Sequence, residues 1–237
     1  MSEWKQKKFW TKSEVTEAEG GFGVALDGRG VKTPAKAPLV VPSRAMAQAI
    51  ADEWAAQEGT VDPMTMPFTR SANAAIDKVR IQHAEVADLV AAYGDADLLC
   101  YRAANPEGLV ARQAERWDPL LDWAQDTLGV RLVTLRGVMH VPQDPLALEV
   151  LVRETHALDP YELTGFHDLV SLSGSLIIGF AALHDAKATS DLWHLSRLDE
   201  EWQAEFWGND DEADAHAAIK KASFLHAKSF VDAHRAG

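Results

Sequence analysis

The side chains with the most chemical potential lie between residues 191 and 213, where carboxylates alternate with aromatic residues. Because a helix turns about 100° per residue, the i, i+3, i+7 spacing places Glu200, Gln203 and Trp207 on one strip. An ion-pairing group, an amide and an indole together suit protein binding, and tryptophan is enriched at binding hot spots. The strip therefore predicts a protein contact. In the alternative, Trp207 packs against a neighbouring helix while Gly208 ends its own.

The same segment also predicts a core-facing stripe, made of leucines and two aromatic residues: Leu192, Leu195, Leu198, Trp202 and Phe206. Asp199 falls at the edge of this stripe, so it needs a buried hydrogen-bond donor or it borders a groove. Arg197 and Glu201 have the i, i+4 spacing of a surface ion pair. We therefore expect Asp199 and Glu201 to lie beside the binding strip.

Motifs for metal, nucleotide or hydrolytic chemistry are missing from the sequence. The histidines include no H-E-x-x-H and no i, i+4 pair. The glycines of residues 20–30 match neither the dinucleotide nor the Walker pattern, and a hairpin explains them better. There is no G-x-S-x-G elbow. The sequence predicts no cofactor and no catalysis, and an enzyme would need an acidic site that no motif identifies.

The charge balance argues against two classes of partner. Asp and Glu number 36 against 23 Lys and Arg, a formal net charge of −13. Nucleic acids and anionic membranes both repel such a surface, so we expect neither as a partner. The charge either keeps the protein soluble or in part faces a basic patch on a partner.

The cysteine content and the hydrophobic stretches indicate where in the cell the protein functions. A lone cysteine, Cys100, fits a reducing compartment, and its apolar neighbours predict a buried, inert thiol. The N-terminus, MSEWKQKKFW, lacks the apolar core of a signal peptide. Residues 169–183 are too short for a membrane span and predict a buried helix. We expect a bacterial cytoplasmic protein, or a mitochondrial one if the chain is a processed organellar form.

Hydrophobic periodicity predicts an α+β protein with two parts. Residues 1–42 read as a small antiparallel β-hairpin region, because residues 22–26 alternate, 27–30 form a turn, and 31–33 and 39–41 can pair back. Residues 43–237 read as a helical domain. Its expected helices are about 43–57, 69–92, 107–128 with a kink or break at Pro119, 145–157, 160–184, 189–207 and 210–235.

Several short segments resemble the ATP synthase assembly factor 2 family, the chaperones of the α subunit of the ATP synthase catalytic head. They are residues 51–57 (ADEWAAQ), 66–69 (MPFT), 72–77 (ANAAID), 95–101 (DADLLCY), 117–123 (WDPLLDW) and 196–203 (SRLDEEWQ), followed by Trp207-Gly208. Their order and spacing extend the resemblance over nearly the whole chain. The organellar extension is absent, which favours a bacterial member.

This resemblance implies a β region followed by a helical domain, without catalysis or cofactor. It also implies a function, the shielding of the unassembled α subunit until the β subunit covers the same surface. We expect Glu200, Gln203 and Trp207 to contact this client, with Glu201 and Asp199 nearby and Glu53 as a further candidate. Two alternatives remain open, a general scaffold or holdase without a single client, and an enzyme with an unrecognised acidic site.

Overall fold

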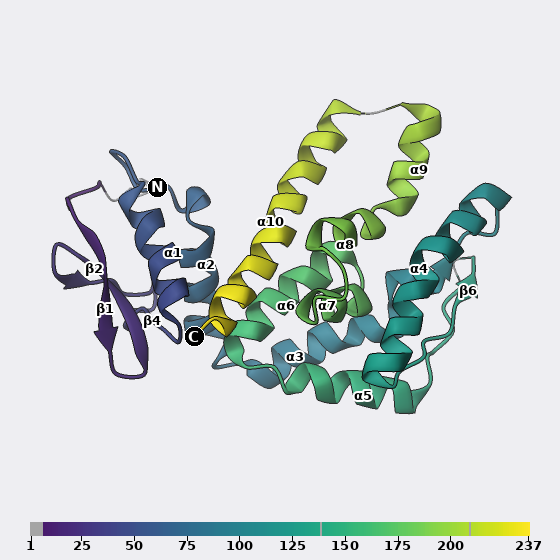
Figure 1. The fold of residues 1–237 in the computed structure, drawn as a ribbon, viewed down its shortest axis with the longest axis horizontal. Helices are drawn as coiled ribbons and strands as arrows, with labels where there is room; N and C mark the ends of the chain where they lie inside the picture. Colours follow the sequence, from purple (N-terminus) through teal and green to yellow (C-terminus); the bar gives the residue numbers. More distant parts are fainter. Residues whose placement is uncertain (1–6, 138, 209) are drawn as a thin grey trace. The chain divides into compact units, whose positions relative to one another are not determined.

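A computed structural model describes residues 7–137, 139–208 and 210–237 (Figure 1). A small antiparallel sheet comes first and helices make up most of the remainder, so the predicted α+β class is confirmed. The chain forms two compact units. The first comprises residues 1–83, 160–164 and 229–237, and the second comprises 84–159 and 165–228.

The sheet of the first unit is built around its second strand, β2 (Gly21–Leu26), which pairs antiparallel with β1 (Ser13–Ala18), β3 (Arg29–Gly30) and β4 (Val40–Val41). Asp27 and Gly28 have φ values of 47° and 77° and join β2 to β3 as a two-residue turn. Positive φ at both central residues is the requirement of a tight hairpin turn, and Asp-Gly satisfies it. The turn predicted over 27–30 is thus confirmed for Asp27 and Gly28, whereas Arg29 and Gly30 already form β3.

Strand β1 was not among the sequence-based expectations, and Asp27 helps to hold its start. The Asp27 carboxylate accepts hydrogen bonds from the backbone N–H groups of Thr11 and Lys12, which lowers its pKa. Residues 31–33 do not form the expected return strand. The paired residues are Arg29 and Gly30, although Val31 N–H still donates to the Val24 carbonyl at 2.8 Å.

Helix α1 (Arg44–Ala55) packs on this sheet, and Ser43 caps its first turn by accepting from Met46 N–H. After the short helix η1 (Pro63–Thr65) follow α2 (Pro67–Ala74) and a π-helical turn, η2 (Ala75–Val79). The core of the unit joins sheet, helices and the end of the chain: Val24, Leu39, Val41, Met46, Ala47, Ile50, Ala51, Ala72, Ile76 and Phe230.

The expected single helix over 69–92 was wrong, because the chain leaves the helical path between residues 80 and 82. Helix α3 (His83–Ala91) begins the second unit and is followed by two 3-10 helices, η3 (Ala92–Ala96) and η4 (Leu98–Cys100). Strand β5 (Tyr101–Arg102) then pairs in parallel with β6 (Leu135–Arg136).

The remaining helices are α4 (Glu107–Leu128), α5 (Pro145–His156), α6 (Pro160–Ser173), α7 (Leu176–Leu183), α8 (Thr189–Ser196), α9 (Leu198–Trp207) and α10 (Asp211–Arg235). Pro119 lies inside α4 and does not break it, so of the expected kink or break the break is excluded and the kink stays a prediction. Every residue of α7 is buried, and α7 packs against α4 and α8 (Figure 1).

The expected helix over 160–184 divides into α6 and α7 because Gly174 has a φ of 73°. Glycine adopts this left-handed conformation at little cost. Ser175 then caps α7, and the fully buried Asp97 accepts from the N–H of Ile177 at 3.0 Å. The start of α7 is therefore stabilised by a carboxylate from a distant part of the sequence.

Three helices contribute residues to both units: α3 gives His83 to the first unit, as α6 does 160–164 and α10 does 229–235. The two units are defined by which residues pack together, whereas the expected boundary at residue 42 separates strands from helices. The division into a β-hairpin region, 1–42, and a helical domain, 43–237, stays a prediction. Residues 1–6 of that β region lie outside the described residues.

Candidate protein-binding site on helix α9

The predicted helix over 189–207 is interrupted at Arg197, whose φ of −111° and ψ of 13° separate α8 from α9. The continuous core stripe expected along it was therefore partly wrong. Leu192 and Leu198 are buried, but Phe206 is 66 % exposed. The expected Arg197–Glu201 pair is also corrected. Arg197 lies outside the helix and instead pairs with Glu200 at 2.6 Å.

Glu200, Gln203 and Trp207 all lie exposed on α9. Trp207 is 88 % exposed, so the alternative in which it packs against a neighbouring helix is wrong. An indole left almost entirely in water is unusual in a protein, because burying it would be favourable. That these three residues form a binding strip remains a prediction.

Asp199 has the donor that its position requires. Its Oδ1 accepts from Nε2 of the buried Gln113 on α4 at 2.7 Å, while Gln113 Oε1 accepts from Ala103 N–H at 2.8 Å. The half-buried carboxylate thus ends a chain of hydrogen bonds that begins in the backbone. Asp199 fixes the first turn of α9 against α4.

Glu201 points to the other side of α9, where three helices meet. Its Oε1 lies 2.6 Å from Nδ1 of His194 on α8, and His194 Nε2 lies 3.1 Å from the ammonium nitrogen of Lys221 on α10. Lys221 can only donate, so His194 Nε2 accepts and Nδ1–H donates to Glu201. This relay places a carboxylate, an imidazole and an ammonium in series.

Arg112 and Gly108 of α4 were missed by the sequence reading. Arg112 donates to both carboxylate oxygens of Glu205 at 2.6 and 2.9 Å, which lowers the pKa of Glu205, and its guanidinium lies 4.4 Å from the Trp202 ring centroid. A Cβ atom on Gly108 would lie 2.8 Å from Trp202 Cη2, so a side chain at this position would force the indole to shift. No spacing signal links residues 93 positions apart in the chain.

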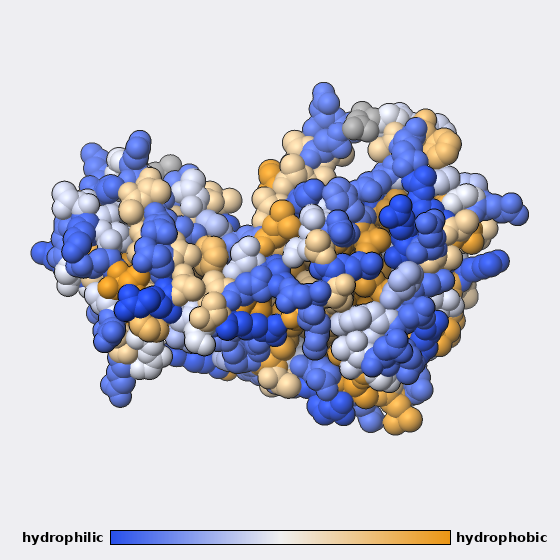
Figure 2. Space-filling model, viewed as in Figure 1, coloured by the Kyte–Doolittle hydropathy of each residue, from blue (hydrophilic) through white to orange (hydrophobic). Residues whose placement is uncertain are grey.

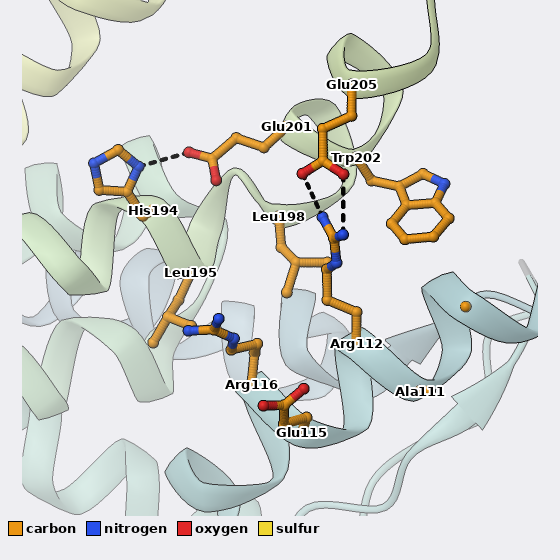
Figure 3. A pocket seen from close by; sticks show the side chains of 11 residues that line it. Ala111, Arg112, Glu115, Arg116, His194, Leu195, Leu198, Glu201, Trp202 and Glu205 are labelled. Carbon is orange, nitrogen blue, oxygen red and sulfur yellow. Dashed lines mark hydrogen bonds and ion pairs between the residues drawn. The ribbon is translucent and has the colours of Figure 1, made fainter.

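A cleft of about 580 Å³ lies between α4 and the α8–α9 segment (Figure 3). Leu195 and Leu198 contribute apolar surface, whereas its charged side chains come from both walls: Arg112, Glu115, Arg116, Glu201 and Glu205. The close-up shows Arg112 reaching from α4 to Glu205 beside the Trp202 indole. An ion pair thus bridges the two walls of the cleft.

Glu53 belongs to the first unit, whereas the α9 residues belong to the second. Its carboxylate accepts from the N–H groups of Phe68 and Thr69 at 2.6 and 2.8 Å, and so satisfies the first turn of α2. Burial raises the pKa of Glu53, while these hydrogen bonds oppose the shift. Its capping role is evident, and a partner contact stays a prediction.

Metal-binding groups were sought across the described residues, and no set of three or more His, Cys, Asp or Glu side chains is arranged to hold an ion. Cys100 is buried, as expected. No helix within the described ranges combines the length and the hydrophobicity needed to cross a membrane.

Comparison with known proteins identifies the family. The profile of the ATP12 chaperone protein family matches residues 7–125, about half of the chain. The chain belongs to the ATP12 chaperone family. A curated ATP12 relative, Protein atp12, mitochondrial, from Schizosaccharomyces pombe, is 26 % identical over 219 residues and covers 87 % of this chain and 75 % of its own. The resemblance found in the short motifs is thereby confirmed.

Solved structures extend the ATP12 similarity beyond the profile. Atp12 from Paracoccus denitrificans is 48 % identical and has a TM-score of 0.94, and the match covers 98 % of this chain and 100 % of the other. The structure of a mutant of the same protein has a TM-score of 0.95. Atu1473, a chaperone by its description, from Agrobacterium tumefaciens is 40 % identical, with a TM-score of 0.92 over 96 % and 85 % of the two chains. The ATP12 fold therefore includes the α8–α10 segment that carries the candidate site.

Proposed function

We propose that this protein binds the unassembled α subunit of ATP synthase and prevents its aggregation before the β subunit joins it. The observation that carries the proposal is membership of a chaperone family, with a fold shared over 98 % of the chain. A lone subunit exposes an apolar interface that it will later share, and such patches drive aggregation.

The physical task limits what the binding surface can be. A chaperone that is later displaced by the β subunit needs moderate affinity, which favours a polar interface with few anchors. Glu200, Gln203 and the 88 % exposed Trp207 have this composition. Asp199 and Glu201, held by Gln113 and His194, lie beside them on the same helix. Glu53 is the second candidate.

Co-expression with the α subunit of the same organism tests the client. We expect soluble α subunit to be retained in a pull-down on this protein and to be lost to the pellet without it. If the α subunit is soluble alone and does not bind, the proposed client is wrong. An aggregating protein unrelated to ATP synthase, protected equally well, would instead favour a general holdase.

A double variant tests the α9 strip. Glu200→Ala with Trp207→Ala should reduce retention of the α subunit by more than tenfold, because an exposed anchor and its flanking charge are lost. Glu85→Ala with Leu89→Ala removes a carboxylate and a 60 % exposed leucine from α3 and serves as the control. Equal retention by both folded variants would contradict the site.

We further propose that the function involves no catalysis and takes place in the bacterial cytoplasm. The family whose profile matches is a chaperone family, and the solved relatives come from bacteria, whereas the S. pombe relative is mitochondrial by name. An enzyme with an acidic site is the rival. A small molecule or metal that copurifies with the protein and is consumed or bound stoichiometrically would support that rival.

A further inference from the structure

The end of α9 exposes two adjacent aromatic side chains, Phe206 and Trp207, at 66 % and 88 %. Trp202 lies behind Phe206, with ring centroids 4.9 Å apart, and is itself held by Arg112. The aromatic pair is therefore attached to a supported helix and is not part of a free chain end. Rigid aromatic side chains make good anchors because little side-chain entropy is lost when they bind.

Within the segment that carries this aromatic pair, the Asp and Glu side chains are not balanced by Lys or Arg. Residues 198–219 contain Asp or Glu at 199, 200, 201, 205, 210, 211, 212 and 214 and contain no Lys or Arg. Figure 2 shows hydrophilic side chains gathered over the upper ends of α9 and α10 beside a few apolar ones. Such a concentration creates a local negative potential much stronger than the average over the protein.

The α9 carboxylates are already engaged within the protein. Asp199 is bonded to Gln113, Glu200 to Arg197, Glu201 to His194 and Glu205 to Arg112. Paired in this way, they can still contact a partner, but they add less to long-range electrostatic attraction than unpaired carboxylates do.

The carboxylates at the start of α10 differ. Asp210 caps the helix by accepting from the N–H groups of Glu212 and Ala213. In the described part of the chain, no ion pair involves the side chains of Asp211, Glu212 or Asp214, and all three are exposed. Carboxylates in the first turn of α10 interact favourably with the helix dipole, but this interaction does not require three of them. They leave uncompensated negative charge a few residues from Trp207.

We propose that Phe206 and Trp207, together with Asp211, Glu212 and Asp214, dock a protein segment in which an apolar side chain is flanked by Lys or Arg. The aromatic pair receives the apolar side chain, Trp207 offers its ring face to a cation, and the α10 carboxylates pair with the basic residues. A second copy of this chain is disfavoured as the occupant because two such acidic ends repel each other. The proposal rests on the proposed function for its client and extends the α9 strip to residues outside it.

Binding of the α subunit tests the charge requirement. The variant Asp211→Asn, Glu212→Gln, Asp214→Asn should associate at least tenfold more slowly than the wild type at about 0.01 M salt, and the difference should narrow at about 0.15 M, where the Debye length falls from about 30 to about 8 Å. Neutralising Glu85, Asp126 and Glu149, which are exposed elsewhere, changes the net charge equally and should have little effect. Equal association rates for the two variants would overturn the proposal and leave the proposed function standing.

A peptide probe tests the surface independently of the client. The Trp207 indole N–H resonance, assigned with Trp207→Phe, should shift on addition of a short Lys/Leu peptide and stay unmoved with the matched Glu/Leu peptide. The shift should be lost in the α10 variant and kept in the control variant. No shift, or equal shifts with both peptides, would overturn the proposal. So would a dimer of this protein that dissociates on Trp207→Ala, since a second copy would then occupy the surface.

Discussion

Arg112 of α4 and Glu205 of α9 form a two-pronged ion pair, with nitrogen–oxygen distances of 2.6 and 2.9 Å, between helices that lie 93 residues apart in the chain. The guanidinium also covers the face of Trp202, 4.4 Å from its ring centroid. A planar fork can do both at once, and a lysine ammonium cannot. This pair, with the Gln113–Asp199 hydrogen bond, fixes α9 to α4.

Arg112→Lys should loosen α9 selectively. Amide hydrogen exchange across 198–207 is expected to be faster than in the wild type, while the melting temperature changes little, because an exposed ion pair contributes little to global stability. Arg153→Lys, which alters an exposed pair with Glu154 on α5, is the matched control. Unchanged exchange in α9 would show that the two-pronged Arg112–Glu205 pair is not needed to hold the helix.

Gly179→Ala should destabilise the second unit. The added Cβ would lie 2.6 Å from Val170 Cγ2 and 2.8 Å from Phe166 Cε2, inside a fully buried layer between α6 and α7. Overpacking of this kind costs ~1–3 kcal/mol, more than the ~1 kcal/mol that alanine gains over glycine in a helix. Urea unfolding measures the difference.

Two further variants make the Gly179 prediction specific. Gly30→Ala meets nothing within 4 Å and should change the free energy of unfolding by less than about 0.5 kcal/mol. Val170→Ala combined with Gly179→Ala should lose less stability than the sum of the single variants, because the smaller side chain removes one clash. Strict additivity would contradict the steric explanation.

Asp97 should make stability fall as the pH rises. Burial raises the pKa of this fully buried carboxyl from 3.8 to about 6, against hydrogen bonds from Ile177 and Leu99. The folded state therefore holds its proton more tightly than the unfolded state. The resulting stabilisation is present below the unfolded pKa of 3.8 and is lost as the pH rises through about 6.

Asp97→Asn separates this effect from the other titrating groups, which the two proteins share. The free energy of unfolding, measured in urea from pH 4 to 7, should fall by up to ~3 kcal/mol more in the wild type than in the variant. The variant is expected to be less stable at every pH, because one amide oxygen replaces two carboxylate acceptors. Parallel pH profiles for the two proteins would refute the assignment.

Cys100 should resist alkylation in the folded protein. Burial, followed by the nearby charge of Asp97, raises the pKa of the thiol to about 12, and the thiolate is the reactive form. Iodoacetamide at pH 8 should therefore modify Cys100 only as fast as the chain unfolds, and rapidly in urea. Modification of the native protein at the rate of free glutathione would show that the site is open.

Local chemistry is what the sequence reading identified well. The Asp27-Gly28 turn, the long helix over 107–128 and the buried apolar helix within 169–183 follow from neighbouring residues, and the structure has all of them. Trp207 was singled out because a tryptophan among polar residues is anomalous wherever it folds, and its exposure bears that out. Ordered motifs also sufficed to predict the family.

The tertiary structure decided where the helices break and what holds the site. Gly174 and Arg197 interrupt patterns whose periodicity continues across them, because packing and capping outweigh a 3.6-residue repeat. Phe206 had the spacing of a core residue but lies at the end of α9, where the rest of the unit does not bury it. The Arg112–Glu205 and Gln113–Asp199 contacts join distant segments, and spacing along one chain carries no information about which residues meet when separate helices pack.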